Sequence, residues 1–154
     1  MEWNCGGHDA ESVWEALKAA GEHQSAFKAA VTNAGCDATV LAEIGWIIRD
    51  DMVVRPDVLI VCGQEPPRYL EHTPAVVVGI LSEVTRERDL TYKRMVYEEQ
   101  SVPWYLIVDP NKDQLIVLER DPGDRYTERE SAVTLALTIC QTCSVELPVA
   151  KCFD

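Results

Sequence analysis

Two charged side chains interrupt apolar segments of this sequence and are the first candidates for a functional site. Asp57 lies within residues 52–62, whose apolar and β-branched composition predicts a strand. Lys93 lies within residues 86–100, where helical spacing puts one stripe of side chains on one side: Arg86, Asp89, Leu90, Lys93, Val96 and Tyr97. An apolar residue would pack better than a lysine on the side of a helix that faces a sheet.

Lys93 therefore has two interpretations. It could aim its ammonium group into a polar pocket at the sheet. It could also run along the core, extend its ammonium group to solvent and pair with Asp89 one turn earlier. The helix carries the densest group of basic residues in the chain, including Arg86, Arg88 and Arg94. These could contact nucleic-acid phosphates, but interleaved glutamates are also typical of a solvated helix face.

The composition of the whole chain is that of a globular protein. It has 154 residues, 47% of them hydrophobic and 26% charged, as expected for one domain over residues 1–154. The net charge of −12 argues against tight nucleic-acid binding through bulk charge, but it leaves room for a local basic groove or a metal-bridged phosphate. The N-terminal residues lack the pattern of an export signal, and no apolar run approaches the length of a membrane span. We therefore expect a cytoplasmic protein that does not cross a membrane.

The predicted elements alternate between helices and strands. Residues 1–36 are expected to be helical: a first helix begins at Asp9 or Ser12 and ends near Ala20, and a second spans residues 22–34, unless the two form one helix bent at Gly21. Strands are predicted at residues 39–48, 52–62, 74–82, 102–108, 113–120 and 125–130. One helix at residues 86–100 is expected to have Thr85 as its N-cap. Residues 132–137 and 144–147 are apolar segments of undecided type.

Six cysteines raise the question of disulfides or a metal site. Since a cytoplasmic protein is expected, we predict reduced thiols, with Cys62 as a small core residue. Cys140 and Cys143 have the spacing of a pair of zinc ligands, but a structural zinc site would need two more ligands from elsewhere in the fold. Ordinary burial or surface thiols are the preferred interpretation.

Several motifs occur in an order that resembles a known family. The matching segments are Arg55-Pro56-Asp57-Val58, residues 74–78, Ile80-Leu81-Ser82, Thr85-Arg86, Arg88-Asp89-Leu90, Lys93, Tyr97 and residues 102–110. As an ordered set they resemble the Uma-two family of putative restriction endonucleases, which are similar to the PD-(D/E)xK nucleases. The resemblance covers residues 39–120 well and the C-terminal strands loosely. It implies an α/β (α+β) fold of the restriction-endonuclease-like type, with a mixed central β-sheet flanked by helices.

The resemblance also implies a metal-dependent phosphodiesterase site. In such a site two carboxylates hold Mg²⁺ or Mn²⁺, the metal activates water and stabilises charge on the phosphate, and a lysine assists. Asp57 matches the first carboxylate, and Lys93 matches a lysine that the family carries on its helix. The implied partner is nucleic acid, with DNA the first expectation and Arg86, Arg88 and Arg94 as candidate contacts. A homodimer is an assembly that the resemblance allows.

Gly79 is the main departure from the family pattern. Members carry a glutamate just before the residues that match Ile80-Leu81-Ser82, and glycine offers no ligand. Glu83 is the alternative metal ligand, but in an extended strand it would lie about 13 Å from Gly79, so it could take this role only if the chain turns sharply at Ser82. The sequence thus predicts an endonuclease weakened at its metal site.

Two other functions remain open. The first alternative is an inactive nuclease-fold module that binds nucleic acid or a protein partner. The second is a zinc-stabilised module in which Cys140 and Cys143 matter and Asp57 does not.

Overall fold

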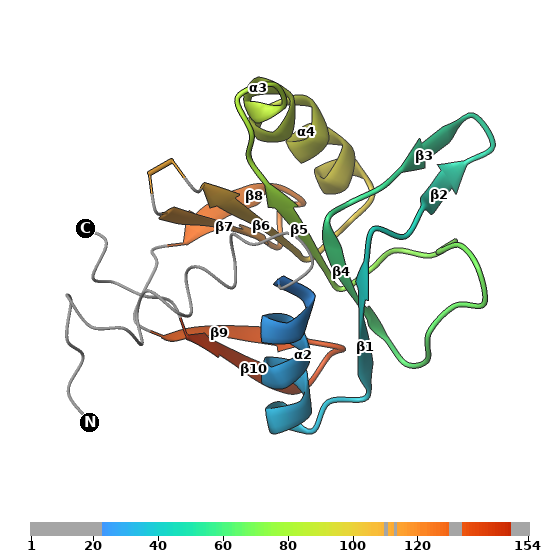
Figure 1. Cartoon of the computed structure of the whole chain (residues 1–154), viewed down its shortest axis with the longest axis vertical. Helices are drawn as coiled ribbons and strands as arrows, with labels where there is room; N and C mark the ends of the chain where they lie inside the picture. The colour runs from blue at the N-terminus through green and yellow to red at the C-terminus, as the bar shows by residue number, and fades with distance from the viewer. Residues whose placement is uncertain (1–22, 110, 113, 130–133, 149–154) are drawn as a thin grey trace.

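A mixed six-stranded sheet forms the centre of the computed structural model, which describes residues 23–109, 111–112, 114–129 and 134–148 (Figure 1). Its strand order is β1-β4-β5-β6-β7-β8. The bounds are Ala38–Ala42 for β1, Val58–Cys62 for β4, Val76–Ile80 for β5, Trp104–Asp109 for β6, Gln114–Arg120 for β7 and Tyr126–Arg129 for β8. β5 and β6 are parallel, and the other neighbours are antiparallel. The predicted mixed sheet is confirmed, with β8 at one edge.

The two central strands are buried on both faces. Most residues of β5 and β6 are β-branched or aromatic, and every residue of β6 is buried. A parallel pair needs a crossover connection, and the helices α3 (Arg86–Leu90) and α4 (Tyr92–Glu99) provide it. The crossover helices cover one face of this strand pair. This explains why both strands have the near-continuous apolar pattern that predicted burial on both faces.

Different elements cover the two faces of the sheet, as Figure 1 shows. One face packs against α2 (His23–Ala34) and the hairpin of β9 (Thr134–Ile139) and β10 (Cys143–Pro148). The predicted apolar side of α2 contacts this core, and Gly35 ends the helix with a φ of 69°, a conformation that glycine adopts without strain. The other face packs against α3 and α4, together with Trp46 of the hairpin formed by β2 (Trp46–Arg49) and β3 (Met52–Val54).

Two of the predicted strands are wrong in extent because the backbone leaves the strand conformation inside each of them. Residues 39–48 divide into β1 and β2, since Glu43 has a φ of 53° and the chain turns there. Residues 52–62 divide into β3 and β4 around Pro56, whose nitrogen cannot donate a ladder hydrogen bond. The second break places Asp57 just before β4 instead of inside a strand.

The single helix predicted for residues 86–100 is also wrong in extent. It is divided into α3 and α4 at Thr91, whose hydroxyl donates a 2.6 Å hydrogen bond to the Glu87 carbonyl. Such a bond to the preceding turn competes with regular helix geometry. Thr85 does stand at the N-cap, but its hydroxyl donates to the Asp89 carboxylate at 3.1 Å instead of capping the helix.

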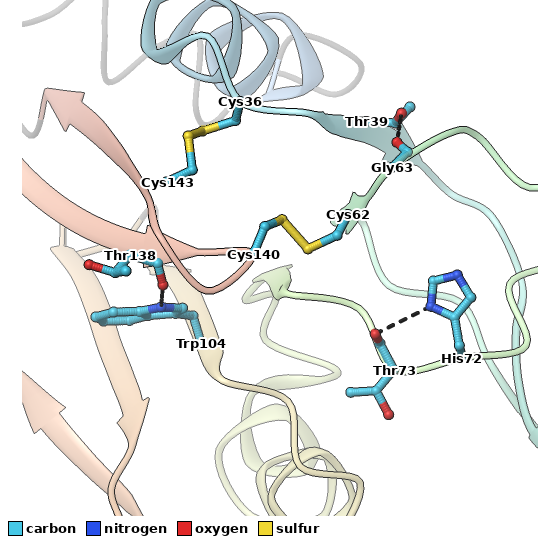
Figure 2. Close-up of a disulfide and its surroundings, with 10 residues drawn as sticks. All are labelled: Cys36, Thr39, Cys62, Gly63, His72, Thr73, Trp104, Thr138, Cys140 and Cys143. Carbon is cyan, nitrogen blue, oxygen red and sulfur yellow. Dashed lines mark hydrogen bonds between the residues drawn. A yellow bond between two sulfur atoms is a disulfide. The ribbon is translucent and has the colours of Figure 1, made fainter.

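The cysteines are the largest correction. Cys36 is bonded to Cys143, and Cys62 is bonded to Cys140 (Figure 2). The prediction of reduced thiols is therefore wrong for these four residues, and Cys62 is exposed at the end of β4 instead of buried in the core. In this oxidised form Cys140 and Cys143 are not available to zinc.

The helix predicted from Asp9 or Ser12 to Ala20 lies outside the described residues. Within the described ranges, no helix is long and apolar enough to cross a membrane.

Candidate functional site

The register of β4 and β5 brings Asp57 opposite Gly79. β4 and β5 are antiparallel, with Val58 opposite Val78 and Leu59 opposite Val77, so one further step of this register places Asp57 opposite Gly79. The backbone N–H of Ile80 donates a 2.8 Å hydrogen bond to Asp57 Oδ2. The half-buried carboxylate is thereby fixed next to the position where a second carboxylate is expected.

Asp57 and Gly79 belong to the face of the sheet that α3 and α4 cover. Side chains alternate along a strand, and Leu59, Val61 and Val77 all contact the core on this face. A Cβ atom at residue 79 would lie 3.4 Å from the Tyr105 hydroxyl oxygen, which is an ordinary contact distance. The missing side chain would therefore point toward the space between β5 and the helices.

Lys93 is held by a buried carboxylate on the same face. Its Nζ lies 2.8 Å from Asp89 Oδ1, and the Asp89 side chain is 3% exposed while that of Lys93 is 32% exposed. The Thr85 hydroxyl donates to Asp89 Oδ2, and the Tyr105 hydroxyl donates to the Asp89 backbone carbonyl at 3.1 Å. The pairing with Asp89, predicted as the alternative to an ammonium group in a pocket, is thus observed.

Two buried tyrosines interact electrostatically with both Asp57 and Asp89. The rings of Tyr97 and Tyr105 meet edge to face, with centroids 4.9 Å apart. Burial is the main cause that raises the pKa of Tyr97 far above its usual value, and the negative charges of Asp89 and then Asp57 raise it further. Burial likewise raises the pKa of Tyr105, with smaller contributions from Tyr97 and Asp89. Both hydroxyls therefore remain protonated, and both carboxylates act on the same small region.

The basic residues of the helix differ in their contacts. Arg86 Nη1 lies 2.9 Å from Asp109 Oδ2, and the Asp109 side chain is 1% exposed. Arg88 is exposed and lies over the Tyr92 ring at 5.8 Å from its centroid. Arg94 is half-buried. Of the three arginines, Arg86 is occupied by an internal ion pair, whereas Arg88 is directed to solvent.

Glu83 lies in the turn that follows β5. The strand ends at Ile80, and a hydrogen bond of 2.8 Å between the Ser82 and Thr85 hydroxyls closes the turn. The chain thus turns at Ser82, but the Glu83 side chain is exposed.

The ligand set fits a hard divalent cation only in part. Asp57 offers a fixed carboxylate, and Gly79 offers nothing. Across the part of the chain that the structure describes, no group of three or more histidine, cysteine, aspartate or glutamate side chains is arranged to hold a metal ion. A hollow of about 350 Å³, lined by residues of α2 and β10 such as Asn33 and Glu146, contains none of the predicted site residues.

Sequence reasoning treated Asp89 only as a partner for Lys93 and gave no role to Tyr105 or to the carboxylate of Asp109. Asp89 could have been found, because it shares the apolar stripe of Lys93 at the spacing of one helical turn. Tyr105 carries no such signal, since it is one apolar strand residue among several.

The mixed sheet with helices on its faces is the fold that the family resemblance implied, and comparison with known proteins agrees. The sequence model of the Uma2 family, described as "Putative restriction endonuclease", matches residues 14–150. The chain therefore belongs to this family.

A solved structure supports the fold. It is the crystal structure of a putative nuclease belonging to DUF820 from Anabaena variabilis ATCC 29413, with a TM-score of 0.57 and 14% sequence identity. The match covers 88% of this chain and 72% of that chain. At this identity the likeness establishes the fold alone. A search of curated proteins found no match.

Proposed function

We propose that this protein is a metal-dependent endonuclease whose metal site is weakened by Gly79. The observation that supports this function best is the position of Asp57, which a backbone hydrogen bond holds opposite residue 79 on the helix-covered face. Mg²⁺ or Mn²⁺, when bound, supplies a Lewis acid and a polarised water for phosphodiester hydrolysis. Asp57 would be the protein ligand, because hard cations prefer carboxylate oxygens.

Lys93 would act on the phosphate. An ammonium group has three donors, and the pair with Asp89 uses one of them and fixes the direction of the others. The remaining donors can stabilise negative charge on a phosphoryl oxygen. The proposed substrate is nucleic acid, with DNA the first choice, and Arg88, the exposed one of the three helix arginines, would contact a neighbouring phosphate.

Gly79 limits this activity. With one fixed carboxylate in place of two, the cation is bound weakly, and cleavage by the natural chain should be slow. A glutamate at residue 79 would restore the second ligand, and the 3.4 Å distance to the Tyr105 hydroxyl shows that its Cβ fits.

The test is plasmid nicking with Mg²⁺ and with Mn²⁺, run on the natural chain, Asp57→Ala, Gly79→Glu and Gly79→Gln. We expect Gly79→Glu to raise the nicking rate and the Mn²⁺ affinity, measured calorimetrically, at least tenfold. Gly79→Gln has nearly the same volume without the charge and should give no gain. Asp57→Ala should abolish nicking when it is introduced into the natural chain and also when it is combined with Gly79→Glu. Cleavage that survives Asp57→Ala, or no gain from Gly79→Glu, contradicts the proposal.

The alternative is an inactive nuclease-fold module that binds nucleic acid or a protein partner. The neutralisation of Lys93 by the buried Asp89 favours it, because this pair needs no metal or substrate to be stable. Duplex DNA that binds to the natural chain without being cut with either cation, with Asp57→Ala binding equally well, would favour this module over the nuclease.

A further inference from the structure

Two disulfides meet at a single turn of the chain. The β9–β10 hairpin closes through Cys140, Gln141 and Thr142, and Cys143 is its first residue on the return strand. Cys143 is bonded to Cys36, just after α2, and Cys140 is bonded to Cys62, at the end of β4. Figure 2 shows the two bonds side by side at this turn. The same short turn is thus attached to two different segments of the fold.

The two bonds have different surroundings. Cys36, Cys140 and Cys143 are half-buried and pack against the apolar core of this face, whereas Cys62 is exposed and is not part of that core. Cys143 Sγ also lies 4.0 Å from the Ala34 carbonyl oxygen at the end of α2. Since thiol–disulfide exchange requires in-line approach of a thiolate to one sulfur, access decides which bond reacts first. The exposed residue, Cys62, belongs to the Cys62–Cys140 bond, whereas both cysteines of the other bond are half-buried.

We propose that Cys62–Cys140 is a thiol–disulfide exchange site for dithiols and that Cys36–Cys143 is a structural crosslink. The thiolate of a dithiol attacks Cys62 Sγ, the S–S bond breaks, and Cys140 leaves as a thiolate that takes up a proton. The second thiol of the reagent then resolves the mixed disulfide. The dithiol is oxidised to a disulfide, the protein gains two electrons and two protons, and Cys62 and Cys140 become thiols.

The hairpin remains docked after this step. Cys36–Cys143 still ties it to α2, and its inward side chains are buried against the sheet: Leu135, Leu137, Ile139, Val145 and Leu147. The exchange therefore gives a folded two-thiol form with a loosened turn. The site lies on the face opposite α3 and α4, so it is independent of the proposed nuclease activity.

The experiment measures reduction at each bond separately. Free thiols of the purified protein are blocked, dithiothreitol is added, and the thiols that appear with time are alkylated with an isotopically distinct reagent and quantified by peptide mass spectrometry. We expect Cys62 and Cys140 to be labelled together at least tenfold faster than Cys36 and Cys143. Equal rates, the reverse order, or Cys62 and Cys140 already blocked as free thiols would overturn the proposal.

Two variants and one analysis complete the test. The double variant Cys62→Ser/Cys140→Ser should lose the fast phase and keep the slow one, and Cys36→Ser/Cys143→Ser should keep the fast phase. Because the natural chain alone gives the order of reduction, a variant that fails to fold does not remove the test. Elemental analysis is run in parallel: stoichiometric zinc bound by these cysteines would also overturn the proposal.

Discussion

The two faces of the central sheet are stabilised by different chemistry. Toward α2 and the β9–β10 hairpin, the buried side chains are apolar, and two disulfides fasten the layer. Toward α3 and α4, the core contains the buried hydroxyls of Tyr97, Tyr105 and Tyr126, and the buried carboxylates of Asp89 and Asp109 lie on the same side. Neighbouring residues of β6 illustrate the contrast, since Trp104 donates to the Thr138 carbonyl on one face and Tyr105 donates to the Asp89 carbonyl on the other.

This difference is the one expected if the proposed site lies on the face toward α3 and α4. A buried carboxylate or hydroxyl costs stability unless it is paired, so an arrangement of several of them is weak evidence for stability and better evidence for a site. The face toward α2 and the β9–β10 hairpin needs no such groups, because apolar burial and the two disulfides stabilise it. Perturbing each face separately tests this division.

Removal of both crosslinks should affect stability most. With Cys36, Cys62, Cys140 and Cys143 all replaced by serine, we expect the free energy of unfolding to fall by roughly 5–8 kcal/mol, because both bonds close long loops in the unfolded chain. Urea unfolding followed by circular dichroism measures this loss. Excess reductant should bring the natural chain to nearly the same midpoint, and an unchanged midpoint would show that apolar packing alone holds this face.

Alkaline pH should destabilise the face that packs against α3 and α4, where three tyrosines are buried. Burial, together with neighbouring negative charge, raises the pKa of Tyr97, Tyr105 and Tyr126 in the folded state, whereas the unfolded chain ionises near pH 10. Their stabilising effect is therefore complete below pH 10 and is lost as the pH rises toward the folded-state values. Linkage gives a loss of about 4 kcal/mol for the three residues by pH 11. Urea midpoints between pH 8 and 11 measure it, and Tyr126→Phe should reduce the slope by about a third.

Breaking the Arg86–Asp109 pair should cost somewhat less. Asp109→Ala leaves Arg86 without its partner and removes the acceptor of the Asn111 and Lys112 backbone N–H groups, so we expect a loss of about 3 kcal/mol. The matched control is Asp51→Ala, which breaks an exposed pair with Arg49 and should cost less than about 0.5 kcal/mol. Similar losses in the two variants would show that burial does not increase the contribution of the Arg86–Asp109 pair to the free energy of unfolding.

Loss of the Tyr105 hydroxyl should have a smaller effect on stability than loss of the Asp109 carboxylate. Tyr105→Phe removes one hydrogen bond to the Asp89 carbonyl and should lower the free energy of unfolding by about 1 kcal/mol. Val77→Ala, on the same face but without a polar contact, is a packing control. If Tyr105→Phe instead raises the free energy of unfolding, the hydroxyl does not stabilise the fold, and a role in the proposed site would be favoured.

Much of the fold was predictable from local sequence. The alternation and apolar runs of residues 74–82, 102–108 and 113–120 indicated β5, β6 and β7, because burial on one or both faces leaves a local pattern. The divisions at Pro56 and Thr91 were missed, since each depends on which hydrogen bonds the backbone finds in the folded chain. The partners of the cysteines could not be predicted either, because spacing along the chain does not fix which sulfurs meet.

The sequence by itself determined the family, the central strands and the two residue types, an aspartate and a lysine, on which the proposed site depends. It also revealed Gly79, because a missing ligand is visible without coordinates. Only the tertiary structure decided that Asp57 is opposite Gly79, that Asp89 holds Lys93, and that four cysteines are crosslinked at one turn. These facts depend on strand register and on contacts between residues far apart in the chain, which local sequence patterns do not encode.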